Sequence, residues 1–334
     1  MSQPPVRIAI NGFGRIGRAI LRIVLAGRAD VELALINEIE PLETCAYLFE
    51  YDSIYGTWPG EVATGPGALI VDGRHVPFHS VPDLRQLDLS GVDLVLECTG
   101  MAGKRAMAER GLEAGARAVL VSGPAAEADV TLVLGANDAA LADQRIISNA
   151  SCTTNALAPL ARLLDEAFGI VSAQMTTVHC YTGSQPTVDK PRGNLERSRA
   201  AALSMVPTTT SARSQMDLVL PTLAGRIEAR AIRVPTASVS CIDLTVQTGR
   251  AVTVGEVNEV LRSASEAGPY ADVFGWTERP LVSSDLRARP ESVIMSGRET
   301  SVSGGGLLRV FGWYDNEWGF SCRMLDMAVR IGTR

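Results

Sequence analysis

A glycine-rich turn directly after the first apolar segment is the feature that most constrains the fold of this chain. Residues 7–11 read as a short strand, residues 12–17 carry the pattern G-x-G-x-x-G, and a helical pattern continues to Val24. The glycines of this pattern are Gly12, Gly14 and Gly17. In this context they allow a tight turn, close approach of a pyrophosphate and close helix–strand packing. The pattern predicts a dinucleotide-binding βαβ unit, with a ligand-free tight turn as the alternative.

An acidic residue ends the next strand of this unit. Residues 31–36 form the predicted strand, and Asn37-Glu38 follows it at about the distance of a ribose-binding acid. A carboxylate at Glu38 accepts hydrogen bonds from a ribose 2′-OH and repels a 2′-phosphate. The pair of signals therefore favours NAD over NADP, and a plain surface acid is the other interpretation of Glu38.

The first half of the chain alternates short apolar runs with helical patterns. Further strand candidates lie at residues 92–98, 118–122, 131–134 and 146–147, and residues 101–115 make a covering helix. Nearly continuous β-rich runs separated by helices are typical of a parallel sheet covered on both faces. An α/β fold is therefore predicted for this half.

The pattern changes after residue 152. Residues 174–181 and 230–247 look like extended strands, and a polar stretch rich in Thr, Ser and Arg lies between them at residues 183–214. Structureless loops of that length are uncommon, so we expect this one to be functional. An α+β second domain is predicted, and residues 318–334 predict a terminal helix that docks back on the first domain.

Length and charge exclude several classes of protein. The chain has 334 residues, 46% of them hydrophobic and 20% charged, with a net charge of −6. Two domains are expected at this length, and the negative balance argues against non-specific nucleic-acid binding. No apolar run approaches ~18 residues, so no membrane span is expected. The residues before Val6 lack the apolar stretch of a signal peptide.

Cysteine and histidine usage narrows the chemistry further. The six cysteines stand at positions 45, 98, 152, 180, 241 and 322, without C-x-x-C spacing. No metal site or disulfide framework is therefore predicted, and a reducing cytoplasm is the expected location. The histidines are His75, His79 and His179. A histidine that acts as base for a reactive thiol must therefore be one of these three residues.

One cysteine lies between small hydroxyl residues at the predicted start of a helix. The run Ser148–Asn155 contains Cys152, and leucines at helical spacing follow it up to Gly169. The first N–H groups of a helix lack intrahelical partners, and the helix dipole adds partial positive charge. Both effects lower a thiol pKa and attract oxyanions. Cys152 is a candidate nucleophile, and a buried inert cysteine is the alternative.

His179 is the candidate base for this thiol. It ends a predicted strand 27 residues after Cys152, which is enough for a helix out and a strand back. An imidazole beside the thiol would activate it and transfer its proton. A core histidine with satisfied hydrogen bonds is the other interpretation, and the presence of Cys152 favours catalysis.

Several residues downstream are candidates for binding an anion. Arg233 interrupts an apolar strand, so its guanidinium needs a partner such as a substrate phosphate or a structural carboxylate. Residues 208–211 offer hydroxyls and backbone donors, or simply a polar loop. Arg197 and Arg199 add positive charge nearby, which Glu196 dilutes.

Taken together, these blocks resemble the phosphorylating glyceraldehyde-3-phosphate dehydrogenase family over essentially the whole chain. The matching segments are Asn11–Arg18, Ser148–Asn155, His179 with Tyr181 and Thr182, Arg199 with three alanines, Arg233-Val-Pro, and Trp313–Gly319. The resemblance implies a Rossmann domain at residues 1–151 and a catalytic domain at 152–317. It also implies that the helix at 318–334 returns to the first domain, and that the protein is a homotetramer.

The resemblance also implies a mechanism and a set of site residues. Cys152 would attack the aldehyde of glyceraldehyde 3-phosphate with His179 as base, and the hemithioacetal would pass its hydride to NAD⁺. Inorganic phosphate would then release the thioester as 1,3-bisphosphoglycerate. Asn316 would orient the nicotinamide carboxamide. The other implied cofactor residues are Gly12, Gly14, Arg15, Ile16, Gly17, Glu38, Thr99 and Ser122. The implied phosphate-binding residues are Ser151, Thr153, Thr182, Arg199, Thr210, Ser211 and Arg233.

Some positions depart from the family pattern. Ser211-Ala212-Arg213-Ser214 stands where the family has Gly-Ala-Ala-Lys, so Ser211 changes the approach of backbone to phosphate. Gly183-Ser184-Gln185 replaces Asn-Asp-Gln and removes a carboxylate, and Ala156 replaces a common cysteine. Lys190 stands at a usually apolar or small position, where its charge would soften discrimination against NADP.

Two other functions stay open at this point. Asn37-Glu38, Phe320 and residues 323–326 look like the erythrose-4-phosphate dehydrogenase branch, whereas Tyr181-Thr182 and Trp313-Tyr314 look like the triose phosphate enzymes. The altered segment from Ser211 also suits a non-catalytic or redox-responsive NAD-binding homologue with an oxidisable cysteine.

Overall fold

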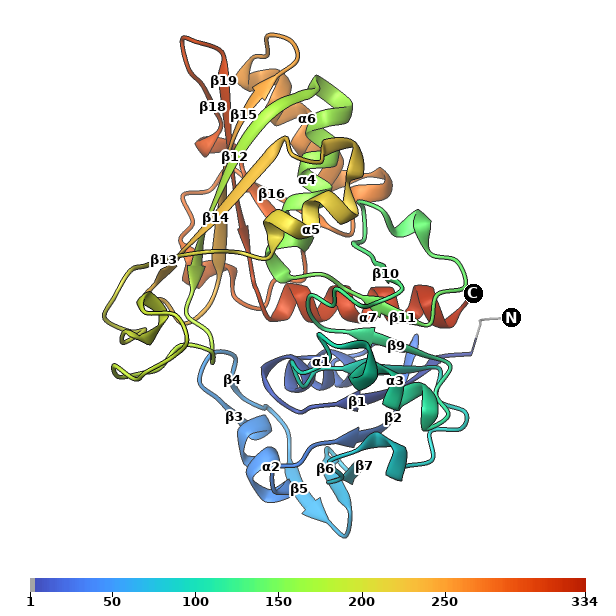
Figure 1. Cartoon of the computed structure of the whole chain (residues 1–334). Helices are drawn as coiled ribbons and strands as arrows, with labels where there is room; N and C mark the ends of the chain where they lie inside the picture. The colour runs from blue at the N-terminus through green and yellow to red at the C-terminus, as the bar shows by residue number, and fades with distance from the viewer. Residues whose placement is uncertain (1–3) are drawn as a thin grey trace. The chain divides into compact units, whose positions relative to one another are not determined.

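The computed structural model describes residues 4–334, which divide into two compact units (Figure 1). Unit 1 holds the described residues up to Leu132, residues 139–150 and residues 321–334. Unit 2 holds residues 133–138 and 151–320. The N-terminal segment that is expected to lack a signal sequence lies partly outside the described residues. The last part of the chain thus belongs to the unit that the first part builds.

Unit 1 contains a largely parallel sheet. Its strands are β1 (Val6–Asn11), β2 (Val31–Asn37), β5 (Val62–Gly65), β6 (Ala68–Val71), β7 (Arg74–His79), β8 (Leu94–Glu97), β9 (Ala118–Val121), β10 (Val130–Thr131) and β11 (Ile146–Ser148). Within the described residues these nine strands run in the order β10-β11-β9-β8-β1-β2-β7-β6-β5. The neighbours from β10 to β7 are parallel, and β6 and β5 add an antiparallel edge. A pair of two-residue strands, β3 (Tyr51–Asp52) and β4 (Gly56–Thr57), lies outside this sheet.

The topology of this sheet predicts where a ligand binds. The chain runs from β1 to β2 on one side, and β8 pairs with the other side of β1. In an open parallel sheet, the ligand crevice forms outside the carboxyl ends of the strands at such a switch point. The glycine-rich turn follows β1 directly and therefore lies at that point.

Helices cover both faces of β1. The helices of unit 1 are α1 (Arg15–Leu25), α2 (Leu42–Glu50), α3 (Arg105–Glu113) and most of α7 (Trp318–Gly332). Side chains alternate along a strand, so Val6 and Ile10 share one face of β1 and Ala9 lies on the other. Gly17 of α1 abuts Ile10 and Gly332 of α7 abuts Val6. The terminal helix therefore packs on the same face as α1.

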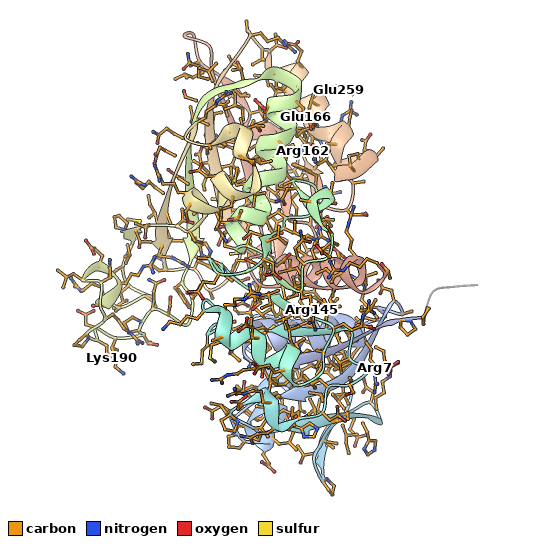
Figure 2. All side chains as sticks on the ribbon, turned by 45° about the vertical axis from the view of Figure 1, so that its right-hand side comes forward. Arg7, Arg145, Arg162, Glu166, Lys190 and Glu259 are labelled. Carbon is orange, nitrogen blue, oxygen red and sulfur yellow. The ribbon has the colours of Figure 1, made fainter. Side chains whose placement is uncertain are left out.

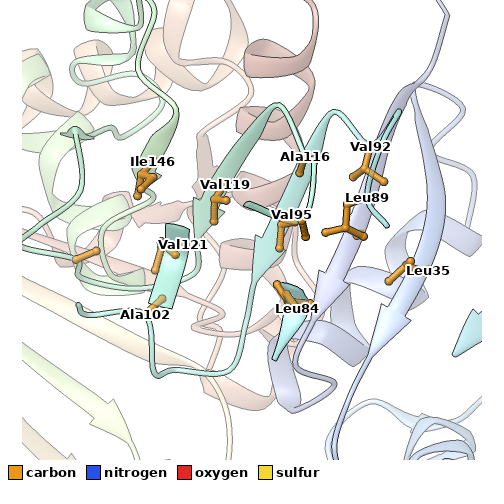
Figure 3. Close-up of a cluster of buried hydrophobic side chains, with 14 residues drawn as sticks. Leu35, Leu84, Leu89, Val92, Val95, Ala102, Ala116, Val119, Val121 and Ile146 are labelled. Carbon is orange, nitrogen blue, oxygen red and sulfur yellow. The ribbon is translucent and has the colours of Figure 1, made fainter. Parts of the chain in front are cut away.

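The opposite face carries a core of small and branched side chains (Figure 3). Ala9 on β1, Val95 on β8 and Val119 on β9 meet residues of α3 there, and Ala108 of that helix is buried. A Cβ at Gly111 would lie 2.9 Å from a Val119 methyl, so a residue without a side chain brings α3 close to the sheet. This core holds the strands in the register that forms the switch point.

Unit 2 is built on a mixed sheet. Its strands are β12 (Ile170–Cys180), β13 (Val206–Thr208), β14 (Ile227–Val234), β15 (Ser240–Thr248), β16 (Phe274–Thr277), β17 (Val293–Ser296), β18 (Ser301–Val302) and β19 (Leu307–Tyr314). In the described part of the chain the order is β13-β14-β12-β15-β19-β17-β16, with β18 paired to β19. The helices are α4 (Cys152–Phe168), α5 (Ala212–Val219) and α6 (Val254–Glu266). β12 pairs parallel with β14 and antiparallel with β15.

The observed elements confirm the α/β class with an N-terminal Rossmann-type domain, a second domain around a large sheet, and a C-terminal helix. The predicted helix at residues 101–115 is shorter, at Arg105–Glu113, and the strand predicted at 131–134 is Val130–Thr131. The run 230–247 is two strands with a turn between them. Strands β5 and β7 carried no clear signal because most of their side chains are exposed or half-buried, and β6 is a buried apolar run of only four residues.

The helices and the potential metal ligands of residues 4–334 were compared with what a membrane span and a metal site require. None of the helices described there is long and apolar enough to cross a membrane. Over the same residues, no group of three or more His, Cys, Asp or Glu side chains is arranged to hold a metal ion.

Candidate active site

The reactive thiol candidate stands at the first residue of a buried helix. Ser151 is the N-cap of α4, and its Oγ accepts a hydrogen bond from the Thr154 N–H at 3.2 Å. Cys152 begins the helix, so its own N–H belongs to the group without intrahelical partners. The chain enters this turn through Ala150, which is fully buried with a left-handed φ of 57°. Such a backbone costs a residue with a Cβ about 1–2 kcal/mol, which the surrounding structure sustains.

Pro159 is accommodated inside α4. The helix runs without interruption from Cys152 to Phe168, although a proline cannot donate the usual backbone hydrogen bond. Nearly all of its first half is buried, whereas Arg162 and Glu166 form an exposed ion pair one turn apart, with Nε and Oε1 at 2.8 Å (Figure 2). The burial of the helix keeps Cys152 in place.

Strand register brings the other functional side chains to the same cavity. His179 on β12 lies directly opposite Arg233 on the parallel strand β14. Two residues earlier on each strand, Thr177 and Ala231 share that face, as the period of a strand requires. A cavity of about 450 Å³ opens here. Its lining residues are Ser151, Cys152, Thr153, Thr177, His179, Arg197, Thr209, Thr210, Ser211, Ala231 and Arg233.

The thiol and the imidazole are in contact. Cys152 Sγ lies 3.6 Å from His179 Nε2, and His179 Nδ1 lies 2.7 Å from the carbonyl oxygen of Cys180. Because a carbonyl can only accept, Nδ1 carries the proton of the neutral ring and Nε2 offers its lone pair to the thiol. Arg233 Nη1 donates to the same carbonyl at 2.9 Å and lies 2.8 Å from Nδ1. Since Nδ1 is itself a donor, we assign the Arg233 hydrogen bond to the carbonyl.

Burial opposes charge at both groups. Burial raises the pKa of the Cys152 thiol, and Arg233 counteracts part of that rise. Burial, together with the Arg233 charge, lowers the pKa of His179 to about 3. The position at a helix N-terminus predicted a lowered thiol pKa, whereas in the folded chain desolvation raises it. The resting pair is therefore a neutral thiol beside a neutral imidazole.

A buried tyrosine ties the helix to the sheet beside this pair. Tyr314 is 2% exposed, and its hydroxyl lies 2.9 Å from Thr153 Oγ1 and 2.8 Å from Thr177 Oγ1. Its ring packs edge-on against His179 with centroids 6.0 Å apart. These contacts fix the first turn of α4 relative to β12, and with it the separation of thiol and base.

The cavity contains the guanidinium groups of Arg197 and Arg233. The sequence predicted Arg233 as a phosphate-binding residue, but predicted Arg197 only as nearby positive charge. Arg197 also lines it, held by hydrogen bonds from Nε to Thr208 Oγ1 at 2.8 Å and from Nη2 to the Thr209 carbonyl at 3.1 Å. Arg199, the residue predicted for the phosphate site, instead pairs with Asp189 at 2.9 Å and has a side chain 64% exposed. Arg197 lies in a short 3-10 helix, Glu196–Ser198, and Arg199 follows it with an extended backbone of φ −87° and ψ 155°.

Thr182 and Lys190 lie elsewhere in unit 2. Thr182, predicted for the substrate phosphate, is half-buried and does not line the cavity, and its Oγ1 shares a hydrogen bond with Ser184 Oγ at 3.0 Å. Lys190 is exposed on the loop that Figure 2 labels, with its backbone N–H donating to Ser198. Ser184 therefore occupies, as a neutral hydroxyl, the position where the family has a carboxylate.

The departure at residue 211 leaves an ordinary backbone. Ser211 has φ −67° and ψ −16°, so its conformation does not require glycine. It precedes α5 and lines the cavity beside Thr210. Arg213 turns to Glu228, with Nη2 and Oε1 at 2.8 Å, and does not line the cavity.

A second cavity, of about 520 Å³, lies in unit 1 at the switch point of the sheet. Gly12, Gly14, Glu38 and Thr99 of the predicted set line it, together with Asn11, Asn37, Ile39, Val81, Pro82, Leu84, Glu97, Cys98, Met101, Met107 and Arg110. Arg15, Ile16, Gly17 and Ser122 do not line it. Arg15 instead forms an ion pair with Asp52 and stacks over Tyr55. Ser122 donates its N–H to the Glu97 carbonyl at 3.0 Å.

The glycines of this cavity fit a dinucleotide. Gly12 has φ +94°, and a Cβ there would lie 2.7 Å from the Cys98 carbonyl carbon. A Cβ at Gly17 would lie 2.2 Å from the Gly12 carbonyl oxygen, whereas the space beside Gly14 is open. The loop thus brings its backbone and the N-terminus of α1 to the cavity, the arrangement that lets a pyrophosphate approach the backbone closely.

Carboxylates line the rest of this cavity. Glu38 Oε2 accepts from the Phe13 N–H at 2.7 Å, which places a negative charge against the glycine-rich loop. Glu97, which sequence reasoning missed, is 3% exposed and accepts from Asn11 Nδ2 at 2.5 Å and from the Thr99 N–H at 3.0 Å. Burial raises the pKa of Glu97. The sequence could have indicated Glu97, because it is the last residue of β8 and ligands of parallel sheets bind at the carboxyl ends of the strands.

Asn316, the last predicted cofactor residue, belongs to unit 2. It follows β19 closely and is buried, and its Oδ1 lies 3.0 Å from Cys180 Sγ. Cys180 is thus connected to two predicted site residues, through its carbonyl to His179 and through its thiol to Asn316.

Comparisons with known proteins match both units. A family model described as "Glyceraldehyde 3-phosphate dehydrogenase, NAD binding domain" matches residues 6–105, and one described as "Glyceraldehyde 3-phosphate dehydrogenase, C-terminal domain" matches residues 151–316. The chain belongs to the glyceraldehyde-3-phosphate dehydrogenase family.

Individual members of the glyceraldehyde-3-phosphate dehydrogenase family match along the whole chain. Proteins named glyceraldehyde-3-phosphate dehydrogenase from Cereibacter sphaeroides and Xanthobacter flavus are each 46% identical to it, and the one from Pseudomonas aeruginosa is 45% identical. Each alignment covers 98% of this chain and 98% of the relative. The match to the family's C-terminal domain begins at Ser151, directly before the thiol.

Proposed function

We propose that this chain is an NAD-dependent phosphorylating dehydrogenase that oxidises glyceraldehyde 3-phosphate to 1,3-bisphosphoglycerate. The observation that carries the proposal is the 3.6 Å contact between Cys152 Sγ and His179 Nε2, in a cavity that also holds Arg197 and Arg233. A nucleophile, its base and two cations in one cavity suit a substrate that has both an aldehyde and a phosphate.

In the proposed reaction the imidazole removes the thiol proton. His179 Nε2 takes the proton as Cys152 Sγ bonds to the aldehyde carbon, and the imidazolium returns it to the oxygen of the hemithioacetal. The Arg233 charge disfavours the imidazolium. A substrate phosphate bound at Arg233 offsets that charge, so substrate binding itself favours proton transfer.

When bound, NAD⁺ would accept the hydride of the hemithioacetal, and Cys152 would then carry a thioester. His179 takes the hydroxyl proton of the hemithioacetal in that step. Inorganic phosphate then attacks the thioester carbon and displaces the Cys152 sulfur, the acyl phosphate leaves, and the proton held by His179 returns to sulfur to restore the neutral thiol. We propose that Arg197, Thr210 and Ser211 hold this phosphate, with Ser151 and Thr153 at the helix N-terminus beside it. Arg199 and Thr182 keep the roles that the family resemblance implies as predictions.

We propose Gly12, Gly14, Glu38 and Thr99 as residues that contact the cofactor. Gly17, Arg15, Ile16 and Ser122 support the surrounding loops, and Asn316 holds the nicotinamide carboxamide. The Glu38 carboxylate beside the loop repels a 2′-phosphate, so NAD is the preferred dinucleotide even with Lys190 present.

We propose further that the protein is a cytoplasmic homotetramer, as its family membership suggests. Between residues 183 and 205 it exposes four large apolar side chains, Val188, Leu195, Leu203 and Met205. Exposed apolar side chains concentrated in one segment of the chain are candidates for subunit contacts. Light scattering on the purified chain measures the assembly directly, and a monomer at micromolar concentration would contradict this part of the proposal.

A steady-state assay tests the activity. Purified protein is supplied with NAD⁺ and either glyceraldehyde 3-phosphate or erythrose 4-phosphate, with and without inorganic phosphate, and NADH formation is followed. We expect a higher kcat/KM for the triose phosphate and sustained turnover only with inorganic phosphate. Cys152→Ser should abolish turnover while NAD⁺ still binds, because the covalent step needs the thiol.

Each contrary outcome has a distinct meaning. Preference for the tetrose phosphate would move the protein to the erythrose-4-phosphate branch. Rapid peroxide oxidation of Cys152 without turnover of either aldehyde would indicate the redox-responsive, non-catalytic homologue. Turnover in the Cys152→Ser variant would exclude the covalent mechanism.

A further inference from the structure

The thiol of Cys180 has no role in the chemistry described above, although it lies between two site residues. Its Sγ is 3.0 Å from Asn316 Oδ1 and 3.8 Å from His179 Nδ1. Cys180 is 1% exposed and Asn316 is 7% exposed. Nδ1 of His179 already donates to a carbonyl, so the thiol proton goes to the nearer partner, the amide oxygen of Asn316.

This thiol is a donor held in a fixed place. Burial raises the pKa of Cys180 to about 12, so the proton stays on sulfur at neutral pH. The Cys180 N–H donates to Ser240 Oγ at 3.1 Å, and its carbonyl accepts from Arg233. Ser240 follows Val239, whose φ of 65° is unusual for a β-branched residue. The backbone around the thiol is therefore constrained from both sides.

The hydrogen bond determines which end of the Asn316 amide is available. Within residues 4–334, Cys180 is the only hydrogen-bond partner of the Asn316 side chain. When Oδ1 accepts from the thiol, the two N–H donors on Nδ2 remain for a ligand. An amide presented in this way meets an acceptor oxygen and disfavours a donor.

We propose that Cys180 is a positioning residue for the cofactor. By donating to Asn316 Oδ1, its thiol holds the amide with Nδ2 toward the carbonyl oxygen of the nicotinamide carboxamide. The inference rests on the proposed function, because it assigns Asn316 to that carboxamide. It predicts that the hydrogen-bond donor at position 180, and not merely the volume of the side chain, contributes to binding of the nicotinamide part of NAD⁺.

Two substitutions of similar size separate these contributions. Cys180→Ser keeps a donor and Cys180→Ala removes it, and Cys241→Ala removes another buried thiol of the same sheet as the matched control. Isothermal titration of the full-length proteins gives dissociation constants for NAD⁺ and for ADP-ribose, which lacks the nicotinamide. Melting temperatures verify that each variant is folded.

The expected result is a selective loss. Cys180→Ala should weaken NAD⁺ binding by about fivefold, the effect of one lost hydrogen bond, and leave ADP-ribose binding unchanged. Cys180→Ser and Cys241→Ala should bind both ligands like the unsubstituted protein. Equal NAD⁺ binding by the Ala and Ser variants, or equal losses for NAD⁺ and ADP-ribose, would overturn the proposal. Failure of the unsubstituted protein to bind NAD⁺ would instead count against the proposed function.

A second readout follows the orientation of the nicotinamide ring. With a deuterium-labelled aldehyde, a loosely held ring accepts some deuteride on its other face, which NMR of the reduced cofactor detects. We expect a minor stereoisomer in Cys180→Ala that is absent from Cys180→Ser. A single stereoisomer in both variants would contradict the positioning role.

Discussion

The Arg233 charge affects the protonation of both Cys152 and His179, because its guanidinium lies close to both groups. The imidazole offers Nε2 to the thiol, and the Arg233 cation lies on the other side of the ring, within 2.8 Å of Nδ1. That cation favours a thiolate and disfavours an imidazolium at the same time. A phosphate bound at Arg233, as proposed, would remove the second effect and so raise the basicity of the imidazole.

This balance predicts a pH dependence of stability. The pKa of His179 is lowered to about 3 in the folded protein, against about 6.5 in an unfolded chain. Its contribution is fully present above about pH 6.5 and is lost as the pH falls toward 3, because only the unfolded state takes up the proton there. At about pH 5 the loss is on the order of 2 kcal/mol.

Melting temperatures at about pH 7.5 and about pH 5 measure this effect. His179→Gln should lose less stability on acidification than the unsubstituted protein. His75→Gln, at an exposed position, is the control and should behave like the unsubstituted protein. An equal loss in His179→Gln and the control would contradict the buried neutral imidazole.

Substitution of Arg197 and substitution of Arg199 should affect the KM for inorganic phosphate differently. Arg197 lines the cavity and Arg199 pairs with Asp189 in solvent. Arg197→Ala should raise the KM for inorganic phosphate by about tenfold or more, since a charged hydrogen bond contributes about 1.5–3 kcal/mol. Arg199→Ala should change that KM by less than about threefold. Steady-state kinetics at saturating aldehyde and NAD⁺ measure both, and the reverse order would restore Arg199 as the phosphate ligand.

At the scale of elements, the site depends on how closely helices approach strands. The N-terminus of α1 reaches its cavity because Gly17 lies against the carbonyl of Gly12, and α4 presents Cys152 because Tyr314 holds its first turn. The β12–β14 register then sets His179 beside Arg233. In each case, the position of the backbone depends on a contact with another segment of the chain.

Two glycine substitutions distinguish packing from ligand contact. In Gly17→Ala the Cβ would meet the Gly12 carbonyl oxygen at 2.2 Å, so α1 must move away from β1. We expect a loss of stability of about 1–3 kcal/mol and NAD⁺ binding weaker by at least about tenfold. In Gly14→Ala the Cβ enters open space, so stability should be unchanged while NAD⁺ binding falls. Thermal melting and titration with NAD⁺ provide both measurements, and an unaltered melting temperature in Gly17→Ala would contradict the packing argument.

At the scale of the whole molecule, the chain leaves unit 1 immediately before its nucleophile. Residues 139–150 belong to unit 1 and Ser151 begins the long segment of unit 2. Ala150, whose φ of 57° is left-handed, is the last residue of unit 1 before Ser151. The direction of the backbone there determines where Cys152 points. Residues 321–334 return to unit 1, with Gly332 against Val6 and Asp326 paired to Arg28. Unit 1 is therefore complete only when the last helix is made.

The sequence predicted an element well where the periodicity or the turn residues of that element alone indicate its structure. The strand, glycine-rich turn and helix from Val6 to Leu25 were readable because periodicity and turn chemistry are local properties. The helix after Cys152 was readable for the same reason. Strands β5 and β7 were not, because most of their side chains are exposed or half-buried, and the apolar run of β6 is only four residues long.

The sequence by itself determined the class of fold, the cofactor signature, and Cys152 and His179 as candidate nucleophile and base. The tertiary structure alone decided that these two side chains touch, that Arg197 and not Arg199 lines their cavity, and that the thiol of Cys180 reaches Asn316. It also decided the resting charge of the site, because desolvation of the Cys152 thiol outweighs the Arg233 charge and the hydrogen bonds from Thr153. Motifs report residue types and spacing along the chain, whereas contact, burial and pKa depend on which distant segments fold against one another.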